Sequence, residues 1–450
     1  MRRTRLSLLL AAFCCLCGAA AAAAQTGRVR HEPLGELRRQ AFLGVTLDPP
    51  NADRAGAEVR RVADADAAAQ AGLRPGDRIL RVNGALIDSP AALERALISL
   101  RGGDTTRFEI VRGGQLLSHT GTLRPLPREQ LQGVETVYDS ALTDLGFRVR
   151  TIVTRPRNAP GKLPAVFLVG WLSCDSVEYP SGPGEDGFAR LLHDIATQSG
   201  HVLVRMDKPG VGDSEGPGCS ETDFRTELAA YRAAFRTLKR YDFVDQGRVF
   251  ILGLSNGGGF APLVPQEEQV RGYVVAGGWS KTWFEHMLEH ERRRLTLGGK
   301  KPGEVTDAMR GYAEFYTDYL RRKMTPREVL QSKPHLAPLW YEGPEHQYGR
   351  PASFFQQLDD LNLAAAWEKV EAPVLVMHGE YDWIMSRDDH RLIADIVNGR
   401  QAGRARFVEL PKTDHLFITF ESMPKAFEGA AGRYHNAVTE HILTFLRQNR

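Results

Sequence analysis

A serine in a glycine-rich turn is the strongest chemical signal in this chain. Ser255 is the centre of the pentapeptide Gly253-Leu254-Ser255-Asn256-Gly257, which directly follows an apolar run at 249–252. A serine hydroxyl is a weak nucleophile until a histidine removes its proton, and that histidine needs a carboxylate to fix its tautomer. An acid and a histidine should therefore follow Ser255. The segments after two later apolar runs supply Glu380, Asp382, Asp414 and His415.

The elements that must position these residues can be read from the apolar pattern beyond residue 134. Short apolar runs predict strands at 135–138 and 147–154. Further apolar strands recur between helical segments, at 165–169, 202–206, 249–252, 273–276, 374–377 and 406–410. This alternation indicates a doubly wound, mainly parallel α/β sheet. Ligands of such sheets bind at the carboxyl ends of the strands, and the informative polar residues all follow such ends.

These segments resemble the catalytic loops of the α/β-hydrolase family. The pentapeptide, with a strand before it and a helix after it, resembles the family's nucleophile elbow. His378-Gly379-Glu380-Tyr381-Asp382 resembles its acid loop, and Thr413-Asp414-His415 resembles its histidine loop. The resemblance, to the serine aminopeptidase and acylglycerol lipase type, implies Ser255 as nucleophile, Asp382 as orienting acid and His415 as general base. Glu380 and Asp414 are substitute acids that the family pattern does not select.

The same resemblance implies two donors for the oxyanion that develops during acyl transfer. One is the backbone N–H of Asn256, which follows the nucleophile. The other is assigned to Trp171 in Gly170-Trp171-Leu172-Ser173, at a place where the family usually has His-Gly or Gly-Gly. Only the backbone of Trp171 is needed for this role.

Two of the five cysteines, Cys174 and Cys219, lie beyond the first 24 residues, which are predicted below to be a signal peptide. Cys174 belongs to the predicted oxyanion segment, and Cys219 follows a run at 205–216 that resembles the family's loop after the fourth strand. We therefore expect a Cys174–Cys219 disulfide beside the site. Two buried free thiols are the alternative.

The interval from about 279 to 367 is too long for a simple crossover and predicts a helical lid. Its aromatic residues could line an acyl or aromatic pocket, although packing against the sheet explains most of them: Trp279, Trp283, Phe284, Phe315, Tyr316, Tyr319, Trp340, Tyr341, Phe354 and Phe355. We expect Glu289, Arg292, Arg293 and Arg294 on a solvated face. The histidines other than His415 are expected on the surface or in packing roles.

A separate small domain precedes residue 124. Alternating runs at 44–47, 57–62, 78–82 and 107–111 predict strands, and Ser89 and Pro90 begin a helix. The segment at 71–84 resembles the signature of bacterial PDZ domains. This resemblance implies that Phe42-Leu43-Gly44-Val45 is a loop that receives the C-terminal carboxylate of a peptide. Leu93 and Leu97 either form the floor of that groove or fill the core.

The first 24 residues have the pattern of a secretory signal. Arg2, Arg3 and Arg5 precede an apolar stretch at 6–18, and small residues end at Ala24, after which we expect cleavage. An uncleaved membrane anchor is the alternative. The interpretation places the mature protein in the periplasm or outside the cell, with no stable membrane anchor.

The amino-acid composition and the net charge restrict the classes of partner and cofactor that we expect. The 450 residues are 42% hydrophobic and 25% charged, which is typical of globular domains. The three leader arginines account for the formal charge of +3, so the remaining chain is neutral and has no general field for nucleic acid. No histidine or cysteine grouping has metal-ligand spacing. We expect no nucleic-acid partner, no metal and no organic cofactor.

These inferences combine into one domain plan and two function hypotheses. The expected segments are a signal peptide at 1–24, a PDZ-like domain at 38–124, a linker at 125–133, and an α/β-hydrolase domain at 134–450. The first hypothesis is a serine hydrolase that cleaves an ester, an amide or a peptide, with the PDZ-like domain binding a protein C-terminus. The alternative is a peptide-binding adaptor whose hydrolase-like domain does not catalyse. Ester and peptide substrates are not distinguished by the sequence.

Overall fold

The computed structural model describes residues 33–51, 54–63, 66–184 and 186–449. The predicted signal peptide at 1–24 lies outside these residues. None of the helices within the described ranges is both long enough and apolar enough to span a bilayer.

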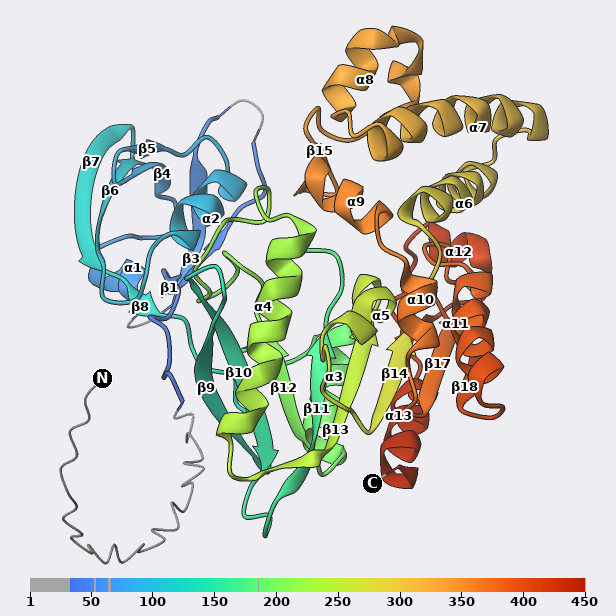
Figure 1. Cartoon of the computed structure of the whole chain (residues 1–450). Coiled ribbons are helices and arrows are strands. Elements are labelled where there is room, and N and C mark those ends of the chain that lie inside the picture. The colour runs from blue at the N-terminus through green and yellow to red at the C-terminus, as the bar shows by residue number, and fades with distance from the viewer. Residues whose placement is uncertain (1–32, 52–53, 64–65, 185, 450) are drawn as a thin grey trace, which may run out of the picture. The chain divides into compact units, whose positions relative to one another are not determined.

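An antiparallel sheet forms the first domain (Figure 1). Its strands lie in the order β2-β3-β4-β6-β7, with β5 paired to β4. Their bounds are β2 Val45–Leu47, β3 Ala57–Val62, β4 Arg78–Val82, β5 Ala85–Leu86, β6 Thr105–Arg112 and β7 Gln115–Thr122. A separate short pair joins β1, Ala41–Phe42, to β8, Arg124–Pro125. The predicted β-rich domain is therefore present.

Two helices complete this domain: α1, Ala67–Gln70, and α2, Pro90–Ile98. As the sequence predicts, the Ser89 side chain caps α2 by accepting a hydrogen bond from the N–H of Ala92. Strand β7 was not expected, because most of its residues are polar. It pairs with β6 along its whole length, and positive φ angles at Gly113 and Gly114 let the chain reverse between the two strands.

An eight-stranded sheet forms the second domain, in the order β18-β17-β14-β13-β11-β12-β10-β9. Its strands are β9 Val134–Leu142, β10 Arg148–Pro156, β11 Leu163–Val169, β12 Val202–Met206, β13 Val244–Leu254, β14 Gly272–Ala276, β17 Val374–Gly379 and β18 Ala405–Leu410. The six strands from β18 to β12 are parallel, and β10 runs antiparallel to both of its neighbours, β12 and β9. The predicted mainly parallel sheet is confirmed.

Helices cover both faces of this sheet. Helices α3 (Gly187–Gln198) and α13 (Ala437–Gln448) share a buried apolar cluster with Val166 and Leu168 on one face. Helices α4 (Phe224–Arg236) and α11 (Arg387–Arg400) belong to a cluster on the other face, where Phe167 and Val169 point. Successive strand residues alternate between faces, so a strand covered on both sides is apolar throughout. The shorter elements are η1 Thr237–Arg240, α5 Asn256–Phe260, η2 Ala261–Leu263, α10 Leu363–Glu368, β19 Ile418–Thr419, α12 Met423–Phe427 and β20 Arg433–Tyr434.

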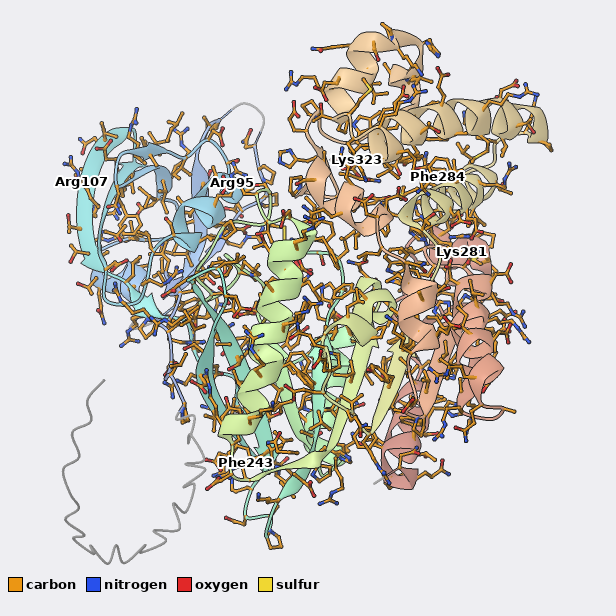
Figure 2. The ribbon with its side chains drawn as sticks, viewed as in Figure 1. Arg95, Arg107, Phe243, Lys281, Phe284 and Lys323 are labelled. Atoms are coloured by element: carbon orange, nitrogen blue, oxygen red, sulfur yellow. A yellow bond between two sulfur atoms is a disulfide. The ribbon has the colours of Figure 1, made fainter. Side chains whose placement is uncertain are left out.

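A helical lid is inserted between β14 and β17 (Figures 1 and 2). Its elements are α6 Trp283–Leu297, α7 Pro302–Tyr316, η3 Thr317–Arg321, α8 Pro326–Ser332, η4 Pro334–Leu339, β15 His346–Gln347, β16 Arg350–Pro351 and α9 Ala352–Asp359. Lys323 and Phe284 tie its parts together, because Nζ of Lys323 binds Asp360 at 2.6 Å and the N–H of Phe284 donates to Asp359 at 2.9 Å. Helix α10 falls inside the interval predicted as the lid, but it packs on the sheet layer, with Trp367 against Tyr273.

One residue near the start of the predicted PDZ-like domain and one in the predicted linker take part in buried ion pairs with residues of the second domain. Arg39, 7% exposed, donates to Glu178 at 2.9 Å and to Asp213 at 2.8 Å. Glu129, inside the predicted linker at 125–133, pairs with Arg205 at 2.6 Å. Arg39 and Glu129 are therefore both held by buried ion pairs.

Candidate active site

Ser255 occupies a sharp turn between β13 and α5. Its φ of 53° and ψ of −126° lie in a region that residues with side chains rarely adopt. The turn is held by a hydrogen bond from the Ser255 N–H to the carbonyl of Ala276, at 2.9 Å, and by one from the Gly258 N–H to the carbonyl of Ser255, also at 2.9 Å. This is the strained strand-turn-helix corner that the resemblance implies.

The glycines around Ser255 allow the close approach of three backbone segments. A Cβ atom on Gly253 would lie 2.7 Å from Cα of Gly258, and one on Gly257 would lie 2.2 Å from the carbonyl oxygen of Val169. No side chain fits at these distances. The glycine spacing of the pentapeptide therefore has a packing cause at both of its ends.

His415 lies within hydrogen-bond distance of both Ser255 and Asp382. His415 Nε2 is 2.9 Å from Oγ of Ser255, and His415 Nδ1 is 2.8 Å from Oδ2 of Asp382. The other oxygen of Asp382 accepts the N–H groups of Ile384 and Met385 at 2.9 and 2.8 Å. All three catalytic candidates are buried. A histidine placed between a hydroxyl and a carboxylate can take a proton from one while the other fixes its tautomer.

The two substitute acids are occupied elsewhere. Glu380 accepts the backbone N–H of Lys412 at 2.7 Å. Asp414 accepts the N–H groups of Leu416 and Ile418 at 3.0 and 2.8 Å. Both carboxylates thus shape the loops around His415, and neither is bonded to its imidazole.

The charges of the Asp382–His415 pair oppose the effect of their burial. Burial alone would raise the pKa of Asp382, but the neighbouring His415 and their hydrogen bond hold it well below its usual range. Burial alone would lower the pKa of His415, but Asp382 raises it above its ordinary value. The carboxylate is therefore ionised, and it stabilises the imidazolium that would form in a reaction.

Trp171 and Asn256, the residues predicted to donate their backbone N–H groups, line the same pocket as Ser255. Neither group has a hydrogen-bond acceptor among the described residues. On the preceding residue, the N–H of Gly170 is bound by the hydroxyl of Tyr231 at 3.0 Å. The two unpaired donors are thus available for an oxyanion.

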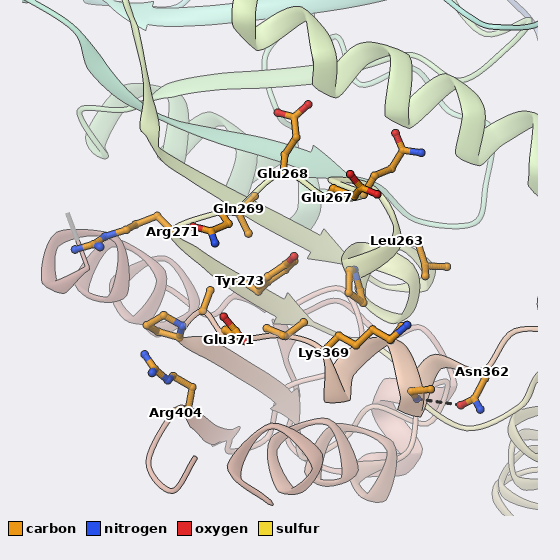
Figure 3. A pocket seen from close by; sticks show the side chains of 18 residues that line it. Leu263, Glu267, Glu268, Gln269, Arg271, Tyr273, Asn362, Lys369, Glu371 and Arg404 are labelled. Carbon is orange, nitrogen blue, oxygen red and sulfur yellow. Dashed lines mark hydrogen bonds between the residues drawn. The ribbon is translucent and has the colours of Figure 1, made fainter. Parts of the chain in front are cut away.

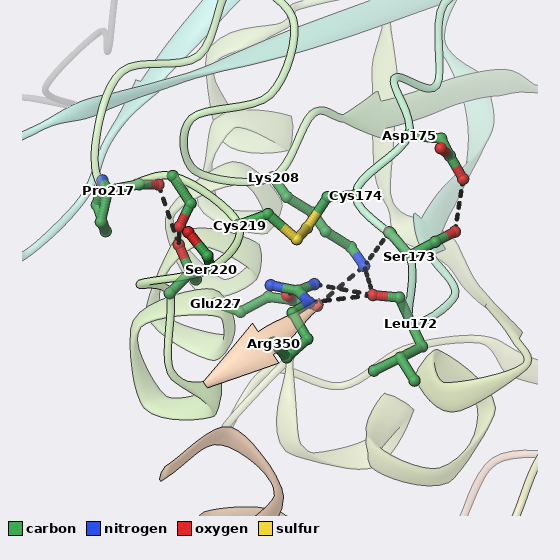
Figure 4. Close-up of a disulfide and its surroundings, with 12 residues drawn as sticks. Leu172, Ser173, Cys174, Asp175, Lys208, Pro217, Cys219, Ser220, Glu227 and Arg350 are labelled. Carbon is green, nitrogen blue, oxygen red and sulfur yellow. Dashed lines mark hydrogen bonds and ion pairs between the residues drawn. A yellow bond between two sulfur atoms is a disulfide. The ribbon is translucent and has the colours of Figure 1, made fainter. Parts of the chain in front are cut away.

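Residues 170–174, called the oxyanion loop below, are tied to the segment after β12 by a disulfide. Cys174 and Cys219 are bonded, with their Cα atoms 6.0 Å apart (Figure 4). The sequence expectation of a bridge beside the site agrees with this geometry. The bridge fixes the end of the loop that leads away from the sheet.

A cavity of about 410 Å³ opens onto Ser255 and His415. Aromatic and imidazole rings form much of its wall: Trp171, Phe188, Trp283, His286, His290, Tyr341, Tyr348 and Trp383. Of these residues, the lid supplies Trp283, His286, His290, Tyr341 and Tyr348, and it also supplies Arg294. Among the described residues that line it, none is an aspartate or a glutamate. Of the ten lid aromatics considered from the sequence, Trp283 and Tyr341 reach this cavity, and most of the others pack in the core.

The expectation of a solvated face on α6 is wrong for Arg293 and Arg294. Arg293 donates to the carbonyls of Trp383 and Ile384, and Arg294 lines the cavity. His286 and His290 also line the cavity, and sequence reasoning missed them. The spacing of His286, His290 and Arg294, four residues apart on one helix, is the signal that could have found this face.

Two further hollows lie apart from these residues. One, of about 680 Å³, is open and lies beside the amino end of β14, lined in part by Glu268, Arg271, Lys369 and Arg404 (Figure 3). Parallel α/β sheets carry their chemistry at the opposite strand ends, so this hollow is not the catalytic candidate.

The other hollow is the groove of the PDZ-like domain, of about 750 Å³. It is lined by residues 40–50 and by Leu93 and Leu97 of α2. The predicted carboxylate loop, Phe42-Leu43-Gly44-Val45, therefore lies along the groove. Gly44 has a φ of 76°, and a Cβ atom there would lie 2.4 Å from the side chain of Asp66. Glycine is thus required at this turn.

Known proteins match the two domains separately. Residues 41–120 match the model of the PDZ domain, and residues 165–430 match the model of the alpha/beta hydrolase family. A probable periplasmic serine endoprotease DegP-like of Chlamydia trachomatis is 35% identical over 26% of this chain and 24% of its own length. Esterase EstD of Thermotoga maritima is 22% identical over 60% of this chain and 58% of its own length.

The chain thus spans less than two thirds of the length of these two relatives. Among solved structures, an esterase of Pyrococcus furiosus is similar over 72% of this chain and 97% of its own, at 11% identity and a TM-score of 0.43. The hydrolase model covers more than half of the chain, including Ser255, Asp382 and His415. The chain belongs to the alpha/beta hydrolase family and carries an N-terminal PDZ domain.

Proposed function

We propose that this hydrolase cleaves carboxylic esters through an acyl-enzyme on Ser255. The hydrogen-bonded series Ser255–His415–Asp382, at 2.9 and 2.8 Å, is the observation that supports the mechanism. His415 Nε2 takes the hydroxyl proton as Oγ attacks the carbonyl carbon, and Asp382 stabilises the imidazolium. The N–H groups of Asn256 and Trp171 bind the oxyanion.

The intermediate then collapses in two stages. The imidazolium of His415 gives its proton to the leaving alkoxide, so that an alcohol departs and the acyl group stays on Ser255. A water molecule attacks the acyl-enzyme while His415 takes a proton from it. Return of that proton to Oγ releases the carboxylic acid and restores the serine.

An ester substrate is favoured over the amino-terminal residue of a peptide, because the cavity lining offers no carboxylate to an ammonium group. An aminopeptidase must bind an ammonium group, and a buried ammonium without a carboxylate partner is strongly disfavoured. The described residues that line the cavity include no carboxylate, and Glu291, which lies outside this lining, is already paired with Arg294 and with the hydroxyl of Tyr341. The many rings of the cavity suit a flat apolar group. We therefore assign the acyl or alcohol portion as uncharged and aromatic.

Two ethyl esters of the same size test this assignment. Ethyl 3-phenylpropanoate and phenylalanine ethyl ester differ by one amino group, which is largely protonated at pH 6.5. After each kcat/KM is divided by the ester's own rate of hydroxide hydrolysis, the uncharged ester should lead by at least about tenfold, as expected for an unpaired buried charge. A preference for the phenylalanine ester would indicate an aminopeptidase instead.

A fluorophosphonate probe tests the nucleophile itself. It should label the wild-type protein and leave Ser255→Ala unlabelled, and the same variant should lose ester turnover while its thermal unfolding is unchanged. Equal labelling of both proteins would refute Ser255 as nucleophile. A wild-type protein that neither reacts with the probe nor cleaves esters would instead support the adaptor hypothesis.

The PDZ domain is proposed to bind the C-terminus of a protein along residues 42–45. Backbone N–H groups of such a loop receive a carboxylate, and the strand edge pairs with the peptide backbone. The position of Leu93 and Leu97 along the same groove supports this role, because they offer an apolar surface to the terminal side chain.

A periplasmic or secreted location is also proposed. The leader pattern at 1–24, the Cys174–Cys219 bridge and the periplasmic name of the DegP-like relative support it. Cell fractionation should recover the protein outside the cytoplasm with Gln25 as its first residue. Recovery of a cytoplasmic protein that begins at Met1 would contradict this location.

A further inference from the structure

Two buried cations from different parts of the chain converge on the oxyanion loop (Figure 4). Lys208, which follows β12 and is 4% exposed, directs Nζ to the carbonyl oxygens of Trp171, Leu172 and Ser173, the last two at 3.2 and 2.9 Å. An ammonium group has three N–H donors, so three successive carbonyls can occupy all of them.

The second cation comes from the lid. Arg350, in β16 and fully buried, donates to the carbonyl of Leu172 from Nη2 at 3.0 Å and from Nε at 3.2 Å. Glu227 of α4, also fully buried, pairs with Arg350 and lies 3.4 Å from Nζ of Lys208. One carboxylate thus faces two cations, and carbonyls of the loop accept further hydrogen bonds from both, whereas Nη1 of Arg350 has no hydrogen-bond partner among the described residues.

The loop is therefore held on both sides of one free donor. Tyr231 binds the N–H of Gly170, the two cations bind the carbonyls from Trp171 onward, and the disulfide fixes Cys174. The N–H of Trp171 lies between these fixed points. The planar peptide group between these points can turn only if ψ of Gly170 and φ of Trp171 change together, so the fixed neighbours restrict the direction of this N–H.

We propose that Lys208 and Arg350 are positioning residues for catalysis, which hold the oxyanion loop so that the N–H of Trp171 points at the developing oxyanion. The proposal rests on the proposed serine-hydrolase function. Burial lowers the pKa of Lys208 to about 8, with Glu227 opposing the fall, so its ammonium remains mainly charged at pH 7. The lid contributes directly to the oxyanion site through Arg350, besides covering the cavity.

Lys208→Met and Arg350→Met test the proposal, with Lys281→Met as the control. Lys281 is a half-buried lysine whose ammonium pairs with Glu289. Loss of an oxyanion donor lowers kcat by about 10²–10³, and a misdirected donor should cost less. We expect each test variant to lower kcat by about 10–100-fold with KM within about threefold, and the control to match the wild type.

Inhibition by a trifluoromethyl ketone distinguishes a loss of oxyanion-loop positioning from a general loosening of the active site, because the adduct of this ketone with Ser255 carries an oxyanion. Its inhibition constant should rise in both test variants by about the factor by which kcat/KM falls, whereas that of the carboxylic acid product stays within about threefold. Unchanged kcat, or equal weakening of both ligands, would overturn the proposal. If Lys208→Met does not fold, Arg350→Met decides alone, since it acts on Leu172 from the lid. A wild-type protein without ester turnover would instead refute the proposed function.

Discussion

Asp382 holds His415 with one carboxylate oxygen and the backbone with the other. Oδ2 lies 2.8 Å from Nδ1 of His415, and Oδ1 accepts the N–H groups of Ile384 and Met385. The carboxylate therefore cannot turn away from the imidazole without losing two backbone hydrogen bonds. This arrangement sets both the tautomer of His415 and its affinity for a proton.

The pH dependence of ester hydrolysis should report this pair. His415 must be neutral to act as a base, and its pKa is raised above the ordinary 6.5 because Asp382 outweighs the effect of burial. We expect kcat/KM to fall as the pH drops through a value above 6.5. In Asp382→Asn only the charge of Asp414 still opposes the lowering of the His415 pKa by burial, so the midpoint should move to lower pH, and kcat should fall by roughly 10⁴-fold. pH–rate profiles of both proteins check this, and identical midpoints would contradict it.

A methyl group at position 257 should disrupt the site. In Gly257→Ala the new Cβ would lie 2.2 Å from the carbonyl oxygen of Val169 and 2.3 Å from that of Gly170. We expect a loss of more than about 2 kcal/mol in the free energy of unfolding, measured with denaturant, together with a loss of activity. Gly303→Ala in α7 is the control, because no atom lies within 4 Å of its Cβ position and alanine favours a helix. Equal stability of the two variants would show that the approach at 257 is not tight.

The bridge between Cys174 and Cys219 should be present in the protein expressed from residue 25. Thiol titration of the denatured, unreduced protein should find no free thiol. Cys174→Ser should unfold at a lower temperature, since a closed loop of 45 residues is worth up to about 4 kcal/mol by chain entropy. Two titratable thiols would refute the bridge.

The buried ion pairs of Arg39 with Glu178 and Asp213 should stabilise the folded protein. In Arg39→Met, Glu178 and Asp213 keep Arg150 but lose their second cation. We expect a loss of about 3 kcal/mol in the free energy of unfolding, near the lower end for breaking a buried pair. The neighbouring Arg38→Met removes an exposed pair with Asp104 and should change stability by less than about 1 kcal/mol. Similar effects of the two variants in chemical denaturation would contradict a special role for Arg39.

Binding at the PDZ groove should depend on a free carboxylate. A peptide selected from a library of free C-termini should bind the Ser255→Ala protein, and its C-terminal amide should bind at least about tenfold more weakly, because charge-assisted hydrogen bonds are the stronger kind. Isothermal titration calorimetry measures both affinities. Gly44→Ala should weaken the free acid, since its Cβ would press on Asp66. Equal affinity for acid and amide would exclude carboxylate recognition by residues 42–45.

Local patterns in the sequence were enough to predict both domains, and the family matches confirm them. The strands at 57–62, 78–82 and 202–206 were predicted with the bounds that the structure has. The turn at Ser255 was also predictable, because a serine between glycines directly after an apolar strand is typical of a tight strand-to-helix corner. Strand β7 escaped prediction, since an exposed polar edge has no apolar alternation to reveal it.

The order of Ser255, an acid and His415 along the chain was determined by the sequence, and it suggested the chemistry. Which of Glu380, Asp382 and Asp414 reaches the imidazole depended on how two loops from neighbouring strands meet. The convergence of Lys208 and Arg350 on Leu172 brings together residues 36 and 178 positions away. Such contacts have no local signature, because the free energy of burying two cations beside one carboxylate depends on the tertiary packing that surrounds them.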